Sequence, residues 1–173
     1  MNEEWFDVVD DRDRVIGREL RAEVHRRGLL HRAVHVLVFD REGRVFLQKR
    51  SMRKDTWPGA WDSSASGHVD SGEDYDACAV RELREELGWT PQRAPERILR
   101  IEACRETGQE FVWVYRCAGE GPFALHPEEI ERGEWFTPAA VDEAVAERPD
   151  TFALSFRHLW ELVRVRIRNV TNE

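Results

Sequence analysis

Short apolar runs separated by turn-forming residues set the order of elements along this chain. Ala33 to Phe39 is almost entirely apolar, which predicts a buried strand. Asp40 to Gly43 is typical of a turn, and Arg44 to Gln48 predicts a second strand. We therefore expect these two strands to form a hairpin at the centre of a sheet.

The residues before this hairpin predict a small N-terminal lead-in. Trp5 to Val9 and Val15 to Gly17 flank an Asp-Asp-Arg-Asp turn, which is typical of a short hairpin. Arg18 to Arg27 predicts a helix that ends near Gly28, because glycine readily adopts the left-handed conformation that closes helices.

Loops, strands and helices alternate in the rest of the chain. Ser51 to Ser66 contains Trp-Pro-Gly and a serine-rich run, which predicts a loop-rich segment. Tyr75 to Leu87 predicts a helix that Gly88 ends. Further strands are expected at Ile98 to Cys104, Glu110 to Cys117 and Glu131 to Phe136, and further helices at Ala139 to Arg148 and Phe156 to Val165. This order favours an α/β fold in which a mixed β-sheet is sandwiched between helices.

Composition narrows the class of protein. A chain of 173 residues with 41% hydrophobic content can bury one core, so we expect one domain spanning residues 1–173. Residues 1–29 would be its lead-in and residues 30–173 its core. The net charge of -8 argues against a nucleic-acid partner, because phosphate backbones attract clustered positive charge. If the protein is an acidic enzyme with an anionic substrate, it would need cations to screen the charge of that substrate.

The cysteines and the first residues predict the compartment. Cys78, Cys104 and Cys117 are odd in number and form no Cys-x-x-Cys pair, which is typical of thiols in a reducing cytosol. The chain starts with acidic residues where a signal peptide would be basic and then apolar. No stretch reaches the roughly 18 apolar residues of a membrane span. We therefore expect a cytoplasmic protein with no membrane partner.

Three carboxylates share one arc of the predicted acidic helix. At about 100° per residue, Glu85 and Glu86 lie roughly 60° and 40° to either side of Glu82. Such neighbours repel each other, and Arg81 and Arg84 are expected to point to other faces. The arc is either a solvated acidic face or a site for a divalent cation that bridges carboxylates and phosphates.

The residues around this helix resemble the Nudix box of a known hydrolase family. From Gly67 the chain has five residues, Glu73, seven residues and then Arg-Glu-Leu-Arg-Glu-Glu-Leu-Gly from Arg81 to Gly88. Trp89 follows, where the family usually has a smaller aliphatic residue. Because so many polar and glycine positions agree, the match is highly specific. The resemblance extends roughly from Leu30 to the C-terminal helix.

The resemblance implies a Nudix fold and hydrolysis of a phosphoanhydride bond by metal-activated water. It implies that Glu82, Glu85 and Glu86 bind the metal, with the Gly67 carbonyl as a further ligand. The implied cofactor is Mg2+, for which Mn2+ can substitute.

Other roles at the site also follow from the resemblance. Glu73 and Arg81 look like the pair that holds the loop against the helix, and a carboxylate at a helix start is favoured by the helix dipole. The water's proton would be accepted by Glu82 or by Glu110 on a later strand, and the choice stays open.

Cations and aromatic residues precede the box. Arg50 and Lys54 lie on the strand and loop expected to border the cleft, so we predict that they bind substrate phosphate. The segment from Trp57 to Trp61 would either stack on a base or pack against the protein.

The flanks of the box resemble the isopentenyl diphosphate isomerase branch of the same superfamily. The shared residues are His25, His31 to Ala33, Leu47 to Arg50, Lys54, Trp57 to Trp61 and Gly67-His68. The isomerase, however, requires a cysteine where Ser66 stands and a second glutamate where Gly108 stands. Serine is a poor replacement in proton transfer because of its much higher pKa. We therefore favour hydrolysis, with the isomerase and a non-catalytic binding module as alternatives.

Three histidines keep most of the isomerase's metal ligands. His25, His31 and His68, together with Glu110, would suit a transition metal as a second metal site. The alternative is that these histidines only form structural hydrogen bonds.

The substrate and the assembly are only coarsely indicated. Downstream signatures for NADH, coenzyme A, ADP-ribose or diadenosine polyphosphates are not found, so a small-molecule nucleotide is expected. A nucleoside di- or triphosphate, or a related nucleoside diphosphate derivative, is the default substrate. Seven tryptophans leave apolar surface for the interface of a homodimer.

Overall fold

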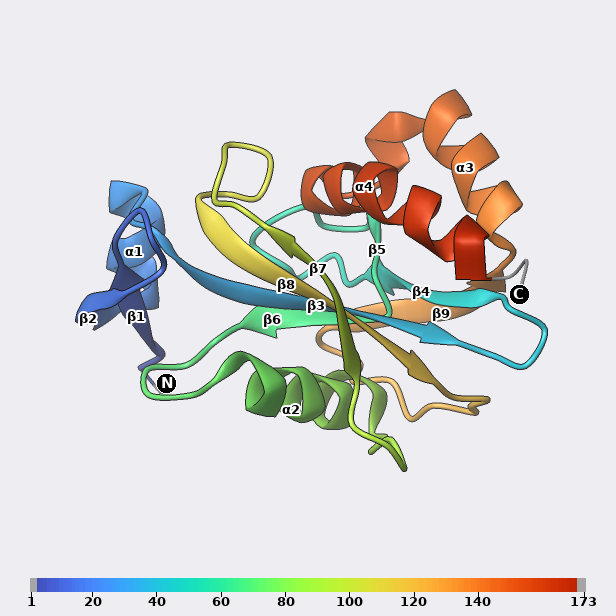
Figure 1. Ribbon diagram of the computed structural model, residues 1–173, viewed down its shortest axis with the longest axis horizontal. Helices are drawn as coiled ribbons and strands as arrows, with labels where there is room; N and C mark the ends of the chain where they lie inside the picture. Colours follow the sequence, from blue (N-terminus) through green and yellow to red (C-terminus); the bar gives the residue numbers. More distant parts are fainter. Residues whose placement is uncertain (1–2, 171–173) are drawn as a thin grey trace.

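A mixed seven-stranded sheet forms the centre of the computed structural model, which describes residues 3–170 (Figure 1). Its strands are β3 (His31–Phe39), β4 (Val45–Arg50), β5 (Trp61–Asp62), β6 (Ala65–His68), β7 (Glu96–Ile101), β8 (Glu110–Ala118) and β9 (Ile130–Phe136). Strand β3 is central, because it pairs antiparallel with β4 and β6 and parallel with β8. The predicted central hairpin is therefore confirmed.

Helices cover both faces of this sheet, as the sequence predicted (Figure 1). Helix α2 (Tyr75–Leu87) lies on one face, and α3 (Pro138–Glu147), the short 3-10 helix η1 (Pro149–Thr151) and α4 (Leu154–Val170) lie on the other. The bounds of α2 agree with the prediction, since the Asp74 side chain accepts a hydrogen bond from the Ala77 amide and Gly88 is left-handed. Within residues 3–170, no helix is both long and apolar enough to cross a membrane.

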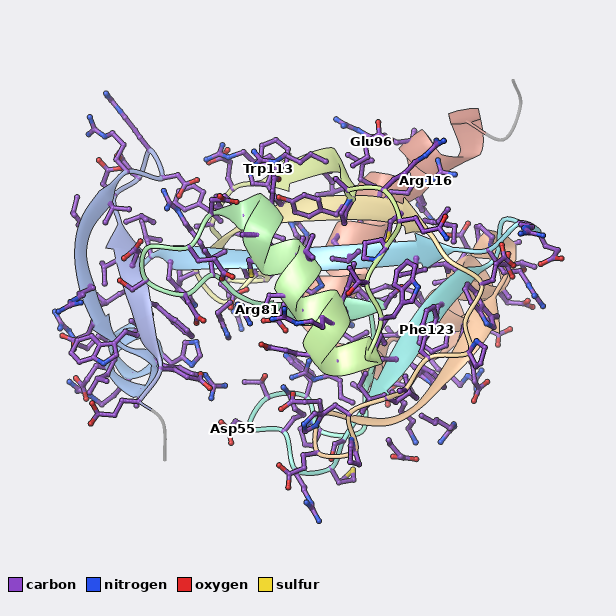
Figure 2. The ribbon with its side chains drawn as sticks, turned by 90° about the horizontal axis from the view of Figure 1, so that it is seen from below. Asp55, Arg81, Glu96, Trp113, Arg116 and Phe123 are labelled. Atoms are coloured by element: carbon purple, nitrogen blue, oxygen red, sulfur yellow. The ribbon has the colours of Figure 1, made fainter. Side chains whose placement is uncertain are left out.

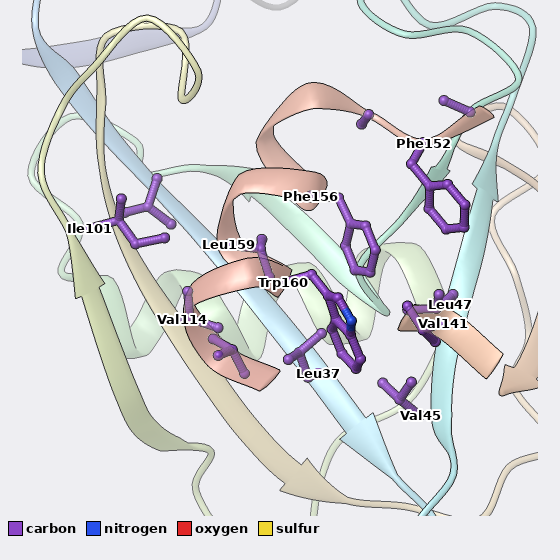
Figure 3. Packing of buried hydrophobic residues seen from close by; sticks show 14 of the residues in the cluster. Leu37, Val45, Leu47, Ile101, Val114, Val141, Phe152, Phe156, Leu159 and Trp160 are labelled. Atoms are coloured by element: carbon purple, nitrogen blue, oxygen red, sulfur yellow. The ribbon is translucent and has the colours of Figure 1, made fainter. Parts of the chain in front are cut away.

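Two hydrophobic cores hold the layers together, one on each side of the sheet. Neighbouring residues of a strand point to opposite faces, so Val36 and Val38 pack under α2 while Leu37 packs under α4. Helix α4 directs Phe156, Leu159 and Trp160 into the core between α4 and the sheet (Figure 3). Each large buried apolar side chain stabilises the fold by about 1.5–3 kcal/mol.

The N-terminal lead-in consists of β1 (Trp5–Val9), β2 (Val15–Leu20) and α1 (Arg21–Arg27). The expected helix from Arg18 is wrong at its start, because residues 18–20 extend β2 and pair with residues 5–7 of β1. Gly28 closes α1 in the left-handed conformation, as expected. This unit lies at one end of the sheet, beside the start of β3 (Figure 1).

Another expected strand ends earlier in the structure than predicted. Strand β7 ends at Ile101 rather than Cys104, because the following residues form a loop closed by hydrogen bonds to Thr107. The segment from Ser51 to Ser66 is loop-rich, as expected, and also contains β5 and the start of β6. Ala65 pairs with Val36 of the central strand, which tertiary contacts alone decide.

Candidate functional site

Glu82 and Glu86 turn from α2 toward β6 and are buried, with 8% and 4% of their surfaces exposed. Glu86 accepts hydrogen bonds from Gln48 Nε2 at 2.7 Å and from the Ser66 amide at 3.1 Å. The Glu82 carboxylate lies so close to Gly67 that a Cβ at position 67 would overlap it. Glu82 and Glu86 therefore do not belong to a solvated acidic face. The close approach of the Glu82 carboxylate explains why the box begins with glycine.

The positive charge near Glu82 and Glu86 does not fully balance the negative charges of their two buried carboxylates. Burial raises the pKa of Glu82 well above its ordinary value, and the neighbouring Glu86 raises it further. Burial also raises the pKa of Glu86 to about 7, although Lys54 and the hydrogen bond from Gln48 oppose this. Placing two like charges in a low-dielectric site is unfavourable, so the site fits a cation with oxygen ligands.

Arg81 connects the loop and the helix of the box (Figure 2). Its guanidinium donates two hydrogen bonds of 2.9 Å to Glu73 and one of 2.9 Å to the His68 carbonyl. Arg81 Nη1 also lies 2.7 Å from Glu82 Oε1 and 3.1 Å from Glu85 Oε2. The expectation that Arg81 points to another face is therefore wrong, because a long side chain can reach around the helix from its Cβ position.

We call Glu82, Glu85 and Glu86 the box carboxylates. Glu85 differs from the other two. Its side chain is 52% exposed and its carboxylate pairs with Arg81. The three carboxylates therefore do not form one equivalent set.

The structure corrects the role expected for Arg50. This arginine is buried, with Nη1 3.1 Å from Asp62 Oδ2 and Nε donating to the Thr56 carbonyl at 3.1 Å. Breaking a buried ion pair is unfavourable, so the guanidinium is committed to holding the loop rather than free for phosphate. Lys54 contacts Glu129, and its charge acts on Glu86, so Lys54 lies beside the box carboxylates.

Two residues near the site carried no motif signal. Gln48 belongs to the segment from Leu47 to Arg50 that resembles the isomerase branch, yet it donates a hydrogen bond to Glu86. Arg21 Nη1 lies 3.6 Å from Asp55 Oδ2, and its buried Nε pairs with Glu4 Oε2 at 3.4 Å without a well-aligned hydrogen bond in the described chain. The spacing of Arg21 and His25, four residues apart in one helix, could have indicated that both face the same side.

His25, His31, His68 and Glu110 come together as the structure's histidine cluster. Their four ligand atoms lie within 4.8 Å of one another. His68 Nε2 lies 3.0 Å from Glu110 Oε1 and 3.3 Å from His25 Nε2. His31 Nδ1 contacts the Leu29 carbonyl at 2.8 Å, which directs Nε2 toward the cluster.

The electrostatics of the histidine cluster suit a metal ion. Burial, together with the neighbouring His68 and His31, lowers the pKa of His25 to about 4, so His25 is neutral near pH 7. Burial opposes ionisation of Glu110, but contacts with His31 and His68 outweigh it and lower the pKa. His31 Nε2 is buried and has no well-aligned partner among residues 3–170, although Glu110 Oε1 lies 3.4 Å away. A neutral imidazole with an unused nitrogen is a metal donor.

A cavity of about 740 Å3 lies elsewhere, lined by Lys49, Arg132 and the segment from Trp57 to Trp61. Lys49 follows Gln48 in β4, and neighbouring strand residues point to opposite faces. Since Gln48 reaches Glu86, this cavity lies on the other side of β4 from the box carboxylates.

Comparison with known proteins identifies the family. A family model described as the NUDIX domain matches residues 29–155. The chain belongs to the Nudix hydrolase family. It is therefore a hydrolase that acts on pyrophosphate bonds, as its resemblance to the Nudix box predicted, and Nudix enzymes generally use divalent metal ions.

Relatives and solved structures agree with this assignment. A Nudix hydrolase of Yersinia pestis is 37% identical over 163 residues, which cover 91% of this chain and 85% of the relative. The Nudix hydrolase YfcD of Escherichia coli is 33% identical over 176 residues, covering 98% and 91%. A crystal structure from Deinococcus radiodurans matches with a TM-score of 0.82 and 28% identity, covering 91% of this chain and 98% of that one.

Proposed function

We propose that this Nudix hydrolase cleaves a phosphoanhydride bond in a nucleoside di- or triphosphate, or in a related nucleoside diphosphate derivative. The observation that carries the proposal is the pair of buried carboxylates, Glu82 and Glu86, set against Gly67 with raised pKa values. Such a pair is suited to a divalent ion and, through it, to a diphosphate.

Glu82, Glu85, Glu86 and the Gly67 carbonyl would hold Mg2+, or Mn2+ in its place. The ions, when bound, neutralise phosphate charge and lower the pKa of water. Arg81 positions Glu82 and Glu85, and Glu73 fixes Arg81 in turn. Lys54 would contact the substrate's phosphate from the opposite loop, where it already lies beside Glu86.

Glu82 is the better candidate for the residue that accepts the proton of the attacking water. Its carboxylate lies against Gly67 and beside Glu86, among the oxygen ligands that would hold the metal and the water. Glu110 contacts His31 and His68, and its lowered pKa makes it a weaker base. We therefore place Glu110 with the histidine cluster instead of with the proton transfer.

The test is release of phosphate or pyrophosphate from a panel of nucleotides and nucleotide conjugates with Mg2+ or Mn2+. Isopentenyl diphosphate is included, and its isomerisation is followed separately. Turnover of one or more nucleotides is expected. Isomerisation of the prenyl substrate would instead support the isomerase alternative, and no turnover at all would support the binding module.

We further propose that the histidine cluster holds a transition metal. The supporting observations are the four converging ligand atoms and the unused, buried Nε2 of His31. Metal analysis of protein purified without an affinity tag should find a bound transition metal near stoichiometry. Its absence after such a purification would leave the cluster with a structural role only.

A homodimer is the assembly we propose. The N-terminal hairpin exposes Trp5, Val15 and Ile16, the last with 68% of its surface accessible. Exposed apolar surface of this kind favours association. Light scattering after size exclusion should give the mass of two chains, and the mass of one chain would contradict the proposal.

A further inference from the structure

Given the metal role proposed for the box carboxylates, we infer that Asp7 is a positioning residue for the metal ion that they hold. Asp7 lies in β1, outside residues 29–155 that match the NUDIX domain model. Its carboxylate reaches the loop between β6 and α2, which belongs to the Nudix box. The N-terminal lead-in therefore supports the site through a residue that the box itself does not contain.

Both oxygens of the Asp7 carboxylate accept hydrogen bonds from this loop. The Ser71 hydroxyl donates to Oδ1 at 2.7 Å, and the Gly72 amide donates to Oδ2 at 3.1 Å. The Ser71 amide also donates to the Trp5 carbonyl at 2.8 Å, and β1 lies beside the loop (Figure 1). Because hydrogen bonds to an ionised acceptor are stronger than neutral ones, the carboxylate fixes the loop against β1.

A short series of contacts connects this loop to the box carboxylates. The Glu73 amide donates to the Asp70 carbonyl at 2.9 Å, and the Asp70 amide donates to Glu73 Oε2 at 3.1 Å, which closes the turn between them. Glu73 accepts two hydrogen bonds of 2.9 Å from Arg81. Arg81 Nη1 lies 2.7 Å from Glu82 Oε1. A turn that moved away from β1 would therefore displace the arginine that orients Glu82.

The start of the same loop is also fixed by β1. Phe6, which is 1% exposed, stacks on the His68 ring with 4.6 Å between the ring centroids. Neighbouring strand residues point to opposite faces, so Phe6 contacts His68 on one side of β1 and Asp7 contacts the turn on the other. His68 follows Gly67, whose carbonyl is a proposed metal ligand. Strand β1 thus holds the loop at both of its ends.

A positioning role differs from a purely structural one in what it changes. A hydrogen bond that only stabilises the fold leaves the metal affinity of the folded protein unchanged. Groups that orient metal ligands raise that affinity, because ligands held in place lose less freedom when the ion binds. Metal affinity and stability are therefore measured separately.

The test is titration of the full chain with Mn2+ alone, followed by the electron paramagnetic resonance signal of the free ion. The Mn2+ that Glu86→Gln no longer binds is the ion at the box carboxylates, which distinguishes it from an ion at the histidine cluster. Asp7→Ala should weaken the binding of this ion by about 10-fold. Asp11→Ala, at an exposed position in the turn of the same hairpin, is the matched control and should bind like wild type.

Further variants and turnover sharpen the test. Ser71→Ala removes one of the two hydrogen bonds to Asp7, so the double variant of Asp7→Ala and Ser71→Ala should bind Mn2+ as Asp7→Ala does. Asp7→Asn keeps one acceptor oxygen and should restore part of the affinity. With a nucleotide that is turned over, Asp7→Ala should raise the half-saturating Mg2+ concentration and keep kcat at saturating Mg2+ within about 2-fold of wild type.

Circular dichroism and thermal melting without metal check that each variant folds. Unchanged Mn2+ affinity at the box carboxylates of a folded Asp7→Ala protein would overturn the inference and leave the metal site intact, and so would an equal loss in Asp11→Ala. If Asp7→Ala does not fold, wild-type affinity in both Asp7→Asn and Ser71→Ala would overturn it. Mn2+ binding that Glu86→Gln does not change would instead remove the metal site, and with it both the proposed function and the role of Asp7.

Discussion

The box carboxylates and the histidine cluster lie next to each other but differ in the elements that supply them and in the ligand atoms that they offer. The box carboxylates come from one helix, offer only oxygen ligands and are read directly from a contiguous motif. The histidine cluster takes its donors from α1, β3, β6 and β8, and offers mainly nitrogen. Gly67 and His68, adjacent in β6, connect the two groups. Hard oxygen ligands suit Mg2+, and imidazoles suit transition metals, so the two groups would select different ions.

The largest expected effect is on the box carboxylates themselves. Glu82→Gln and Glu86→Gln should each lower turnover by at least roughly 100-fold, because they remove charge from the site where we propose that the metal binds. Circular dichroism should show an unchanged fold. Glu96→Gln, at an exposed position of β7 away from α2 (Figure 2), is the control and should behave like wild type. Near-normal activity in both site variants would refute the assignment.

The next largest effect is expected at Gly67, which lies between the box carboxylates and the histidine cluster. Gly67→Ala would place a Cβ where the Glu82 carboxylate lies, so Glu82 must move. We expect turnover to fall by about 10-fold or more, since small displacements of catalytic groups are costly. Gly17→Ala is the matched control, because a Cβ there meets nothing within 4 Å. Equal activity of the two variants would show that Glu82 tolerates displacement.

The histidine cluster should respond in metal content more than in turnover. His31→Asn removes the unused Nε2, and the transition metal retained after purification should fall by about 10-fold or more. Turnover with added Mg2+ should fall by less than it does in the box variants. His126→Asn lies outside the cluster and is the control. Unchanged metal content in His31→Asn would remove His31 from the set of ligands.

Lys54→Ala tests which cation borders the box. We expect KM for a nucleotide substrate to rise by about 5-fold with a smaller change in kcat, since one phosphate contact is lost. Lys49→Ala, on the other side of β4, should leave KM unchanged. A larger effect in Lys49→Ala than in Lys54→Ala would move substrate binding to the cavity beside Trp57.

The smallest expected effect is on stability in the absence of metal. The pKa of Glu86 is raised to about 7, so its stabilising contribution is present below about pH 4.5 and is lost as the pH rises through 7. Relative to Glu86→Gln, the melting temperature of wild type should fall by about 5 °C between about pH 5 and pH 8. Mg2+ should reverse the loss at the higher pH. A pH-independent difference would mean that Glu86 keeps an ordinary pKa.

The order of elements and the acidic helix could be predicted from the sequence alone. The bounds of Tyr75 to Leu87 follow from a side-chain cap and a glycine, both of which act within a few residues. The Nudix box could be recognised for the same reason, because its proposed metal ligands and its supporting arginine are spaced along one loop and one helix. Interactions between residues that are close in the sequence leave a pattern that can be recognised in the sequence.

Which charged side chains are available to a ligand and which are engaged in ion pairs depends on contacts between distant segments. Arg50 and Lys54 are four residues apart and look alike as cations, yet Arg50 is buried against Asp62 and Lys54 lies beside Glu86. The same holds for His25, which reaches His68 only because the N-terminal lead-in lies at the end of the sheet. Burial and long-range contacts depend on how distant segments pack, and no spacing along the chain records them.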